Sequence, residues 1–241
     1  MLKVENISAG YGKLQILNGI SIEARPQQIT VIVGPNGSGK STLLKTIAGL
    51  TNIYAGSITS EGRKTSGLQP HEIARSGIAY LPQTESVFAQ LSVIENFKMA
   101  GYTVKPGEFE GRFKYVMGMF PNLEAYLKTK ASNLSGGERQ MVAMSMALIR
   151  NPRVIMFDEP TANLSPKIAM QVLQTISQLS RETDMTILLV EQNAFRALEI
   201  GDSAYLLVSG KTVFSGTGKA LLEQKELGKL YLGLKTSEDE N

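Results

Sequence analysis

The chain has 241 residues, of which 42% are hydrophobic, so it is long and apolar enough to bury a substantial core. Because it has no cysteine and one histidine, a disulfide framework, a cysteine-ligated zinc, a thiol nucleophile and a two-histidine metal site are all excluded. The histidine, His71, lies in a Gln-Pro-His-Glu turn, where we expect a surface position. The net charge of +3 is mild and the basic residues are scattered, which disfavours nucleic-acid binding.

Membrane insertion and secretion are also disfavoured. The longest uninterrupted apolar run is Ala204 to Val208, whereas a spanning helix needs about 20 residues. The N-terminus lacks the apolar core of a signal peptide. Together with the absence of cysteine, these features predict a cytosolic protein.

Strand signals dominate the first 50 residues. Residues 2–23 alternate in character and carry turn signals at Gly10-Tyr-Gly12 and Asn18-Gly19, which predicts antiparallel strands. Residues 29–33 form a β-branched run that ends at Gly34, and a glycine-rich loop leads to a helix over 43–48 that Gly49 ends.

Further along, continuous apolar runs of strand length predict strands buried on both faces of a parallel sheet, at 78–81, 154–157 and 186–190. Between the last two, Ser165-Pro166 starts a helical pattern that extends to Glu182 and provides the crossover that parallel strands require. Ser209-Gly210 joins two more strands.

The methionine-rich segment 92–150 lacks β-branched runs and predicts several helices. We therefore expect a single domain with a core formed by 1–91 and 151–234, a helical subdomain over 92–150, and a flexible tail over 235–241.

A phosphate-binding motif lies at the junction between the strand 29–33 and the following helix. Residues 34–41 fit Gly-x-x-x-x-Gly-Lys-Ser, in which backbone N–H groups converge on phosphate oxygens. Lys40 would reach the β and γ phosphates, and Ser41 would ligate Mg²⁺. An ordinary glycine turn is the weaker interpretation, because both flanking elements are present. The predicted nucleotide-binding residues here are Gly34, Pro35, Asn36, Gly37, Ser38, Gly39, Lys40, Ser41 and Thr42.

Two acidic residues end the buried strand over 154–157. Asp158 is suited to hold the Mg²⁺ shell. Glu159 points the other way along an extended chain, and its carboxylate could polarise the attacking water. A helix cap is the alternative role for the pair.

The pentapeptide Leu134-Ser-Gly-Gly-Glu138 precedes a helix, and its Ser hydroxyl and glycine amides form a second anion site. With this motif the chain resembles an ABC-type ATPase. The resemblance implies an α/β P-loop NTPase fold with a mainly parallel core sheet, an N-terminal antiparallel β-subdomain and an inserted helical subdomain. It also implies that Ser135, Gly136, Gly137 and Glu138 bind the γ-phosphate of ATP held by a second subunit, head to tail.

Other positions match the family residue by residue. Tyr11 looks like the aromatic that stacks on adenine, and Gln83 looks like the glutamine that contacts metal and water; a packed strand tyrosine and a surface glutamine are the alternatives. The loop from Asn163 to Ser165 corresponds to one that crosses the dimer interface, although the family commonly has Asp at the Ser165 position. A further departure is Gln192, where most members carry a histidine that contacts the γ-phosphate. Glutamine can donate an amide hydrogen bond there but cannot become cationic.

The string Val190-Glu-Gln-Asn193 is similar to that of one ATPase subunit of branched-chain (hydrophobic) amino-acid importers. The resemblance implies an ATP-hydrolysing subunit that uses ATP and Mg²⁺, with Glu159, Gln192 and Lys40 as catalytic residues and Ser41, Gln83 and Asp158 around the metal. It would be peripheral on the cytoplasmic face of the cell membrane. Its expected partners are a second ATPase subunit in a homodimer or heterodimer, transmembrane permease subunits and, indirectly, an extracytoplasmic solute-binding protein.

Other functions remain open. A P-loop kinase or GTPase does not account for residues 134–138, and the Asn-Lys-x-Asp motif of GTPases is absent from the sequence. A non-transport ABC ATPase usually carries long coiled-coil insertions or two ATPase cores, whereas these 241 residues hold one core without a heptad pattern. A purely structural nucleotide-binding module is disfavoured by Glu159. An importer of another solute, such as urea or another amino acid, has the same motifs.

Overall fold

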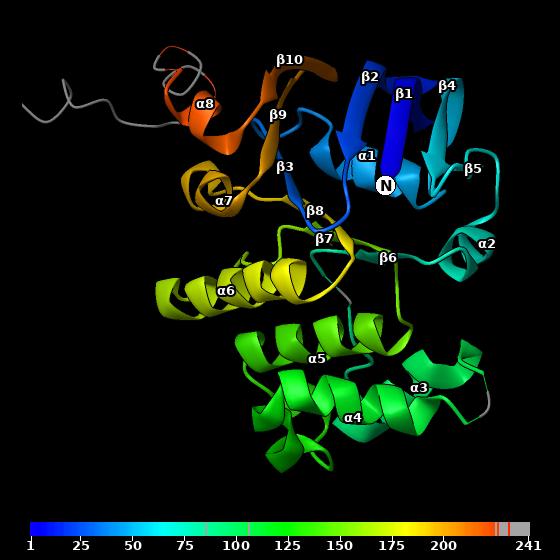
Figure 1. Ribbon diagram of the computed structural model, residues 1–241, viewed down its shortest axis with the longest axis vertical. Helices are drawn as coiled ribbons and strands as arrows, with labels where there is room; N and C mark the ends of the chain where they lie inside the picture. Colours follow the sequence, from blue (N-terminus) through cyan, green and yellow to red (C-terminus); the bar gives the residue numbers. More distant parts are fainter. Residues whose placement is uncertain (85, 106, 225, 227–230, 232–241) are drawn as a thin grey trace, which may run out of the picture.

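The computed structural model describes residues 1–84, 86–105, 107–224, 226 and 231. Two sheets and several helices make up this part of the chain (Figure 1). The strands are β1 (Leu2–Tyr11), β2 (Leu14–Ala24), β3 (Ile29–Val33), β4 (Asn52–Ser60), β5 (Arg63–Lys64), β6 (Ile78–Leu81), β7 (Val154–Asp158), β8 (Thr186–Val190), β9 (Ser203–Val208) and β10 (Lys211–Gly216). The α-helices are α1 (Lys40–Ile47), α2 (Pro70–Arg75), α3 (Val93–Ala100), α4 (Phe109–Met119), α5 (Gly136–Ile149), α6 (Pro166–Glu182), α7 (Ala194–Ile200) and α8 (Gly218–Leu222). Three short 3-10 helices are η1 (Gly101–Thr103), η2 (Pro121–Tyr126) and η3 (Ala131–Asn133).

The larger sheet has the strand order β10-β9-β3-β8-β7-β6, and all of its pairs are parallel except β9 with β10. Its central strands β3, β7 and β8 are buried at every position, which explains their continuous apolar sequences. The parallel pairing places the carboxyl ends of β3, β7 and β8 along one edge. The residues that follow these strands therefore meet at that edge, as ligand-binding residues do in open α/β sheets.

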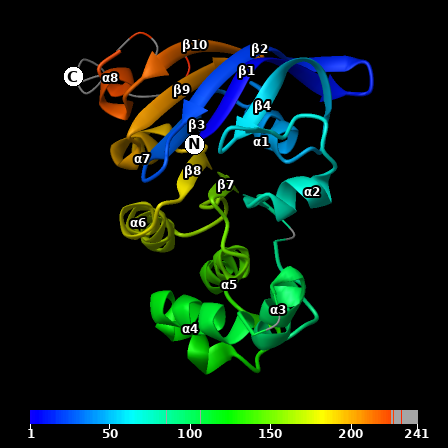
Figure 2. The ribbon, with the colours of Figure 1, turned by 45° about the vertical axis from the view of Figure 1, so that its right-hand side comes forward.

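Side chains of the larger sheet alternate between two apolar clusters because the period of a strand is two residues. Ile32 packs with α1 and the smaller sheet, whereas Val31 and Val33 pack on the opposite face with α5, α6 and α7. In Figure 1, α6 and α5 lie below this sheet, and α5 contacts both α6 and β6. Helices α3, α4 and α5 lie together at the end of the molecule away from the smaller sheet (Figure 2).

The smaller sheet is antiparallel with the order β2-β1-β4-β5, and it confirms the expected strand pair over residues 2–23. One turn expectation is wrong. Gly12 lies at the β1–β2 turn, but Asn18 and Gly19 are inside β2, where the register with β1 shifts. A β-bulge uses the same left-handed glycine as a turn does, and Gly19 has φ 68°.

The other elements either agree with the sequence expectation or differ from it at the start of α1 and in β4. Helix α1 begins at Lys40, three residues before the expected start, because the phosphate loop leads directly into it. The expected strands joined by Ser209-Gly210 are β9 and β10, and the expected helix 166–182 coincides with α6. Strand β4 was not expected, since the first half of the strand is mostly exposed and it carries little hydrophobic alternation. The expected tail over 235–241 lies outside the described residues.

Candidate active site

The phosphate loop joins β3 to α1, and all nine predicted residues lie in the loop or the first turn of α1. A Cβ at Gly34 would lie 2.1 Å from the Leu207 carbonyl oxygen of the neighbouring strand, and the φ of Gly34 is 151°. Only glycine therefore allows the chain to leave β3 at this angle. Gly39, with φ 102°, then caps α1, so that the helix N-terminus faces the loop.

Lys40 lies inside this loop. Its Nζ donates to the Gly34 and Pro35 carbonyl oxygens at 2.9 and 3.1 Å, and its side chain is buried. Burial lowers the pKa of Lys40, and the nearby Glu159 and Asp158 carboxylates oppose that shift. The Ser38 hydroxyl is also buried and has no hydrogen-bond partner among the described residues. An ammonium group and a buried hydroxyl in a glycine loop are suited to phosphate oxygens.

Asp158 lies at the carboxyl end of β7 and is 3% exposed. Its Oδ1 accepts a 2.8 Å hydrogen bond from Ser41 Oγ, and its Oδ2 accepts one of 2.9 Å from the Tyr80 hydroxyl. A hydroxyl and a carboxylate in contact beside a phosphate loop are the ligands that Mg²⁺ takes together with substrate phosphates. The described residues contain no group of three or more His, Cys, Asp or Glu that could hold a metal ion.

Tyr80 was not anticipated as a site residue. Burial, followed by the charge of Asp158 and the hydrogen bond to it, raises the pKa of Tyr80 well above its usual range. The phenol therefore stays protonated and donates to Asp158. Tyr80 lies three residues before Gln83, on a strand adjacent to β7, and this position could have identified it from the sequence.

Glu159 follows Asp158 and leaves the sheet in a left-handed conformation, with φ 50°. Its backbone N–H donates to the Val190 carbonyl oxygen at 2.9 Å. Its carboxylate accepts a 3.0 Å hydrogen bond from the Gln83 amide. The structure therefore brings Gln83 and Glu159 together, although 76 residues separate them. A carboxylate held in this way next to the phosphate loop can accept a proton from water.

Gln192 and Tyr11 border this region on exposed segments. Gln192 follows β8 by two residues, and Asn193 caps α7 by accepting from the Arg196 N–H at 3.3 Å. Tyr11 ends β1 with 43% of its surface exposed, so its ring is accessible for stacking. The residue between β8 and Gln192 is Glu191, a buried carboxyl group that the motif search did not identify.

The motif at 134–138 forms the start of α5. The Ser135 hydroxyl accepts from the Glu138 N–H at 3.3 Å, and the Glu138 carboxylate accepts from the Ser135 N–H at 2.7 Å. These bonds form a capping box, and the bond from the Ser135 N–H is the main reason for the lowered pKa of Glu138. Gly137 packs tightly on α6, since a Cβ there would lie 2.5 Å from Ile168 Cγ2.

This helix start is not part of the phosphate-loop site in the same chain. A cavity of about 680 Å³ lies beside Ser135, Gly137 and Glu138, and its lining residues come from 121–126, 135–141 and Ile168. None of the loop residues 34–42 lines it. The cavity at the start of α5 is therefore separate from the phosphate loop.

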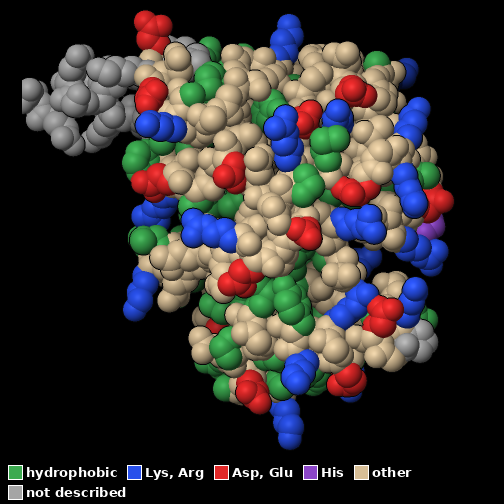
Figure 3. All heavy atoms as spheres, viewed as in Figure 1, with side chains coloured by type: hydrophobic (Ala, Val, Ile, Leu, Met, Phe, Trp, Pro, Cys, Tyr) green, Lys and Arg blue, Asp and Glu red, His purple; other side chains and the backbone are tan. Residues whose placement is uncertain are grey.

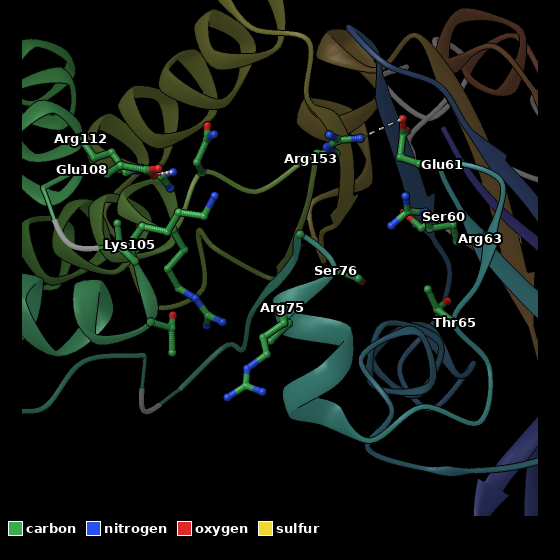
Figure 4. A pocket seen from close by; sticks show the side chains of 16 residues that line it. Ser60, Glu61, Arg63, Thr65, Arg75, Ser76, Lys105, Glu108, Arg112 and Arg153 are labelled. Atoms are coloured by element: carbon green, nitrogen blue, oxygen red, sulfur yellow. Dashed lines mark hydrogen bonds and ion pairs between the residues drawn. The ribbon is translucent and has the colours of Figure 1, made fainter.

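A strongly basic cavity of about 560 Å³ lies elsewhere, between β5, α2 and the helices α4 and α5 (Figure 4). Its charged lining residues are Glu61, Arg63, Arg75, Lys105, Glu108, Arg112, Arg150 and Arg153. Glu61 lies 3.8 Å from Arg153, and Glu108 pairs with Arg112. None of the predicted nucleotide-site residues lines this cavity.

Over the face seen in Figure 3, Lys and Arg are interspersed with Asp and Glu and form no continuous basic stripe. No helix in the described part of the chain has the length and apolar character needed to cross a membrane.

Comparisons with known proteins agree with this geometry. A family model described as "ABC transporter" matches residues 17–162. The chain is 50% identical over 234 residues to the probable branched-chain amino acid transport ATP-binding protein LivF of Archaeoglobus fulgidus, covering 97% of this chain and 99% of that protein. It is 40% identical over 233 residues to the high-affinity branched-chain amino acid transport ATP-binding protein BraG of Pseudomonas aeruginosa, covering 97% and 100%. A solved dimeric post-hydrolysis state of an ATP-binding cassette bound to ADP and Pi superposes with a TM-score of 0.77 at 26% identity, covering 90% of this chain and 98% of that one.

Proposed function

The chain belongs to the ABC transporter family of ATP-binding proteins, and we propose that it is the ATP-hydrolysing subunit of a branched-chain amino-acid importer. The observation that carries the ATPase assignment is the convergence of Lys40, Asp158 and Glu159 at one sheet edge, where Ser41 and Gln83 contact the two carboxylates. The amino-acid assignment rests on the names of the two relatives at 40 and 50% identity, which match along almost their whole length.

In the proposed reaction, the phosphate loop binds the ATP phosphates and Lys40 exchanges its bonds with the Gly34 and Pro35 carbonyl oxygens for bonds to phosphate. Ser41, Asp158 and Gln83 are the residues that would hold Mg²⁺, which neutralises charge on the phosphates when bound. Glu159 accepts the proton of the attacking water, and Gln83 orients the Glu159 carboxylate. Gln192 donates an amide hydrogen bond to the γ-phosphate. Tyr11 stacks on the adenine ring.

A second ATPase subunit would complete the site. Ser135 and its neighbours start a helix that is not part of the phosphate-loop site of the same chain, so their anion position is available to the ATP of a partner. ATP held between two subunits would close the dimer, and loss of the γ-phosphate would permit opening. Permease subunits in the membrane and an extracytoplasmic solute-binding protein are the further partners that the proposal requires. The subunit would be peripheral on the cytoplasmic face of the membrane.

The test of the ATPase assignment is phosphate release by the purified chain with ATP and Mg²⁺. We expect release in the parent and none in Lys40→Ala, with Lys211→Ala on the exposed strand β10 as the matched control. Release that is unchanged in Lys40→Ala would overturn the assignment.

The transport assignment needs a cellular readout. We expect a strain that lacks this chain to lose uptake of radiolabelled leucine at submicromolar concentration and to regain it with the parent gene, but not with the gene for Lys40→Ala. Unchanged leucine uptake together with lost urea uptake would instead support the importer of another solute.

A further inference from the structure

Glu191 is a buried carboxyl group in contact with the loop that follows Glu159. It is 2% exposed and lies between the last residue of β8 and Gln192. One carboxylate oxygen accepts a 3.0 Å hydrogen bond from the Thr161 N–H, and the other accepts one of 2.9 Å from the Thr161 hydroxyl. Burial raises the pKa of Glu191 to about 7, against the opposing effect of the two Thr161 bonds, and the negative charge of Glu159 adds to the rise.

Thr161 is in the middle of the segment that connects Glu159 to α6. The Ala162 N–H donates to the Glu159 carbonyl oxygen at 3.1 Å, and the Leu164 N–H donates to the Thr161 carbonyl oxygen at 3.2 Å. Both Glu159 and Asn163 have left-handed backbones, with φ of 50° and 60°. Such conformations persist where neighbouring contacts hold them, and the Glu191 carboxylate supplies two of those contacts.

The same two segments enclose a cavity of about 550 Å³. One wall is formed by residues 161–164 and the other by residues 191–196, including Gln192. The Glu191–Thr161 contact joins the two walls, because Glu191 and Thr161 both line the cavity. A shift of one wall against the other would therefore change the distance and orientation between the Gln192 and Glu159 side chains.

We propose that Glu191 is a positioning residue that fixes Glu159 and Gln192 in one relative geometry by binding Thr161 through both carboxylate oxygens. This inference rests on the proposed ATPase function. A backbone hydrogen bond from the Glu159 N–H to the Val190 carbonyl oxygen attaches the start of the Glu159 loop to the end of β8. The Glu191 carboxylate binds the loop at Thr161, two residues further along. This second attachment constrains rotation of the loop about the first hydrogen bond.

Positioning and simple structural support predict different kinetics. A misplaced reacting group lowers kcat, and displacements of about 1 Å can cost up to about 100-fold. The proposed ATP contacts of Lys40 and the phosphate loop lie on β3 and α1, outside the two walls, and Gln192 is the one proposed phosphate contact inside them, so KM for ATP should change much less than kcat. Loss of general structure would instead lower the melting temperature and the fraction of active protein.

Conservative variants can keep the hydrogen bonds between residues 191 and 161. In Glu191→Gln, the amide oxygen accepts from the Thr161 N–H, and the amide nitrogen donates to the Thr161 hydroxyl, which is both donor and acceptor. Glu191→Leu has neither bond. On the other side, Thr161→Ser retains a hydroxyl and Thr161→Val does not.

The experiment measures kcat and KM of Mg²⁺-ATP hydrolysis for the whole chain, together with ATP affinity and melting temperature. We expect kcat to fall about tenfold in Glu191→Leu and in Thr161→Val, with KM within about twofold. Glu191→Gln and Thr161→Ser should stay within about threefold of the parent kcat. Glu191→Leu/Thr161→Val should be no worse than Glu191→Leu, since Glu191→Leu already removes both hydrogen bonds and Thr161→Val removes only the one from the hydroxyl.

Thr175→Val is the matched control, because the Thr175 hydroxyl donates an exposed hydrogen bond to the Gln171 carbonyl oxygen within α6, and neither residue lines the cavity. Its kcat should equal that of the parent. Three outcomes would overturn the positioning role while the ATPase assignment stands. They are a parent-like kcat in Glu191→Leu, additive losses of kcat in the double variant, and a kcat in Glu191→Gln as low as in Glu191→Leu. A parent chain without Mg²⁺-dependent hydrolysis would overturn the ATPase assignment and the positioning role with it.

Discussion

The Gln83 amide donates a 3.0 Å hydrogen bond to the Glu159 carboxylate across the edge of the larger sheet. Gln83 follows β6, at the point where the chain leaves the sheet for α3, whereas Glu159 follows β7. The bond therefore links the strand end that carries the proposed base to the segment that leads into the helices α3, α4 and α5.

If Glu159 is the general base, its isosteric amide should bind ATP and fail to hydrolyse it. In Glu159→Gln we expect kcat to fall by about 100-fold or more, because general-base catalysis contributes about 10² to 10⁴. ATP affinity should be retained, and ATP should trap the dimer. Phosphate release and size-exclusion chromatography with ATP and Mg²⁺ measure the two effects. Hydrolysis by Glu159→Gln at the parent rate would show that another group activates water.

Gln192→His tests whether this site is adapted to glutamine. Imidazole can donate the same hydrogen bond to a γ-phosphate and can also become cationic. We expect kcat to be equal to or higher than that of the parent, by analogy with the family. Steady-state hydrolysis from pH 6 to 8 measures the difference, with Gln192→Ala as the variant that lacks the donor. Complete loss of activity in Gln192→His would show that the surroundings accept only an amide.

Glu191 predicts a pH dependence of stability. Its folded-state pKa is raised from 4.5 to about 7, so the folded state binds the proton more tightly than the unfolded state between these pH values. The free energy of unfolding should therefore decrease as pH rises through this window, by about 3 kcal/mol at most, and level off above pH 7. Urea unfolding at pH 5, 6, 7 and 8 measures the slope.

Glu191→Gln is the control for this slope, since it retains the hydrogen bonds and cannot titrate. We expect the parent curve to fall more steeply than the variant curve between pH 5 and 7. The exposed His71 is present in both proteins, so the comparison removes its contribution. Equal slopes would contradict the raised pKa.

Gly137→Ala should destabilise the contact between α5 and α6. The added Cβ would lie 2.5 Å from Ile168 Cγ2, on a β-branched side chain that has little freedom to move. We expect a loss of about 1–3 kcal/mol in the free energy of unfolding, measured by urea titration. Gly111→Ala in α4 is the matched control, because nothing lies within 4 Å of a Cβ there, and it should stabilise by about 0.5–1 kcal/mol.

Truncation of the opposing side chain tests the cause. Gly137→Ala/Ile168→Ala removes the crowded methyl group, so adding Gly137→Ala to Ile168→Ala should cost less than adding it to the parent. The same penalty in both backgrounds would mean that the clash with Ile168 is not responsible.

The candidate site divides into parts that the sequence predicts and parts that it does not. The phosphate loop, Asp158 and Glu159 could be predicted because each belongs to a short motif next to an unambiguous strand. The same holds for the start of α5, where Ser135 and Glu138 are three residues apart and form a capping box. The contacts of Tyr80 with Asp158, of Gln83 with Glu159 and of Thr161 with Glu191 were not predictable, since hydrophobic periodicity does not specify which strand ends become neighbours.

The sequence by itself determined the local chemistry of this protein. Glycine at position 34 and the lysine and serine that begin α1 predict a phosphate site within eight residues, and the buried β3, β7 and β8 follow from continuous apolar runs. Tertiary structure decided the long-range contacts. Strand order placed Tyr80 against Asp158, which is 78 residues away, and Glu191 against Thr161, which is 30 residues away. It also paired the weakly patterned β4 with β1, from Leu2 opposite Ser60 to Gly10 opposite Asn52, a long-range pairing that local hydrophobic alternation does not specify.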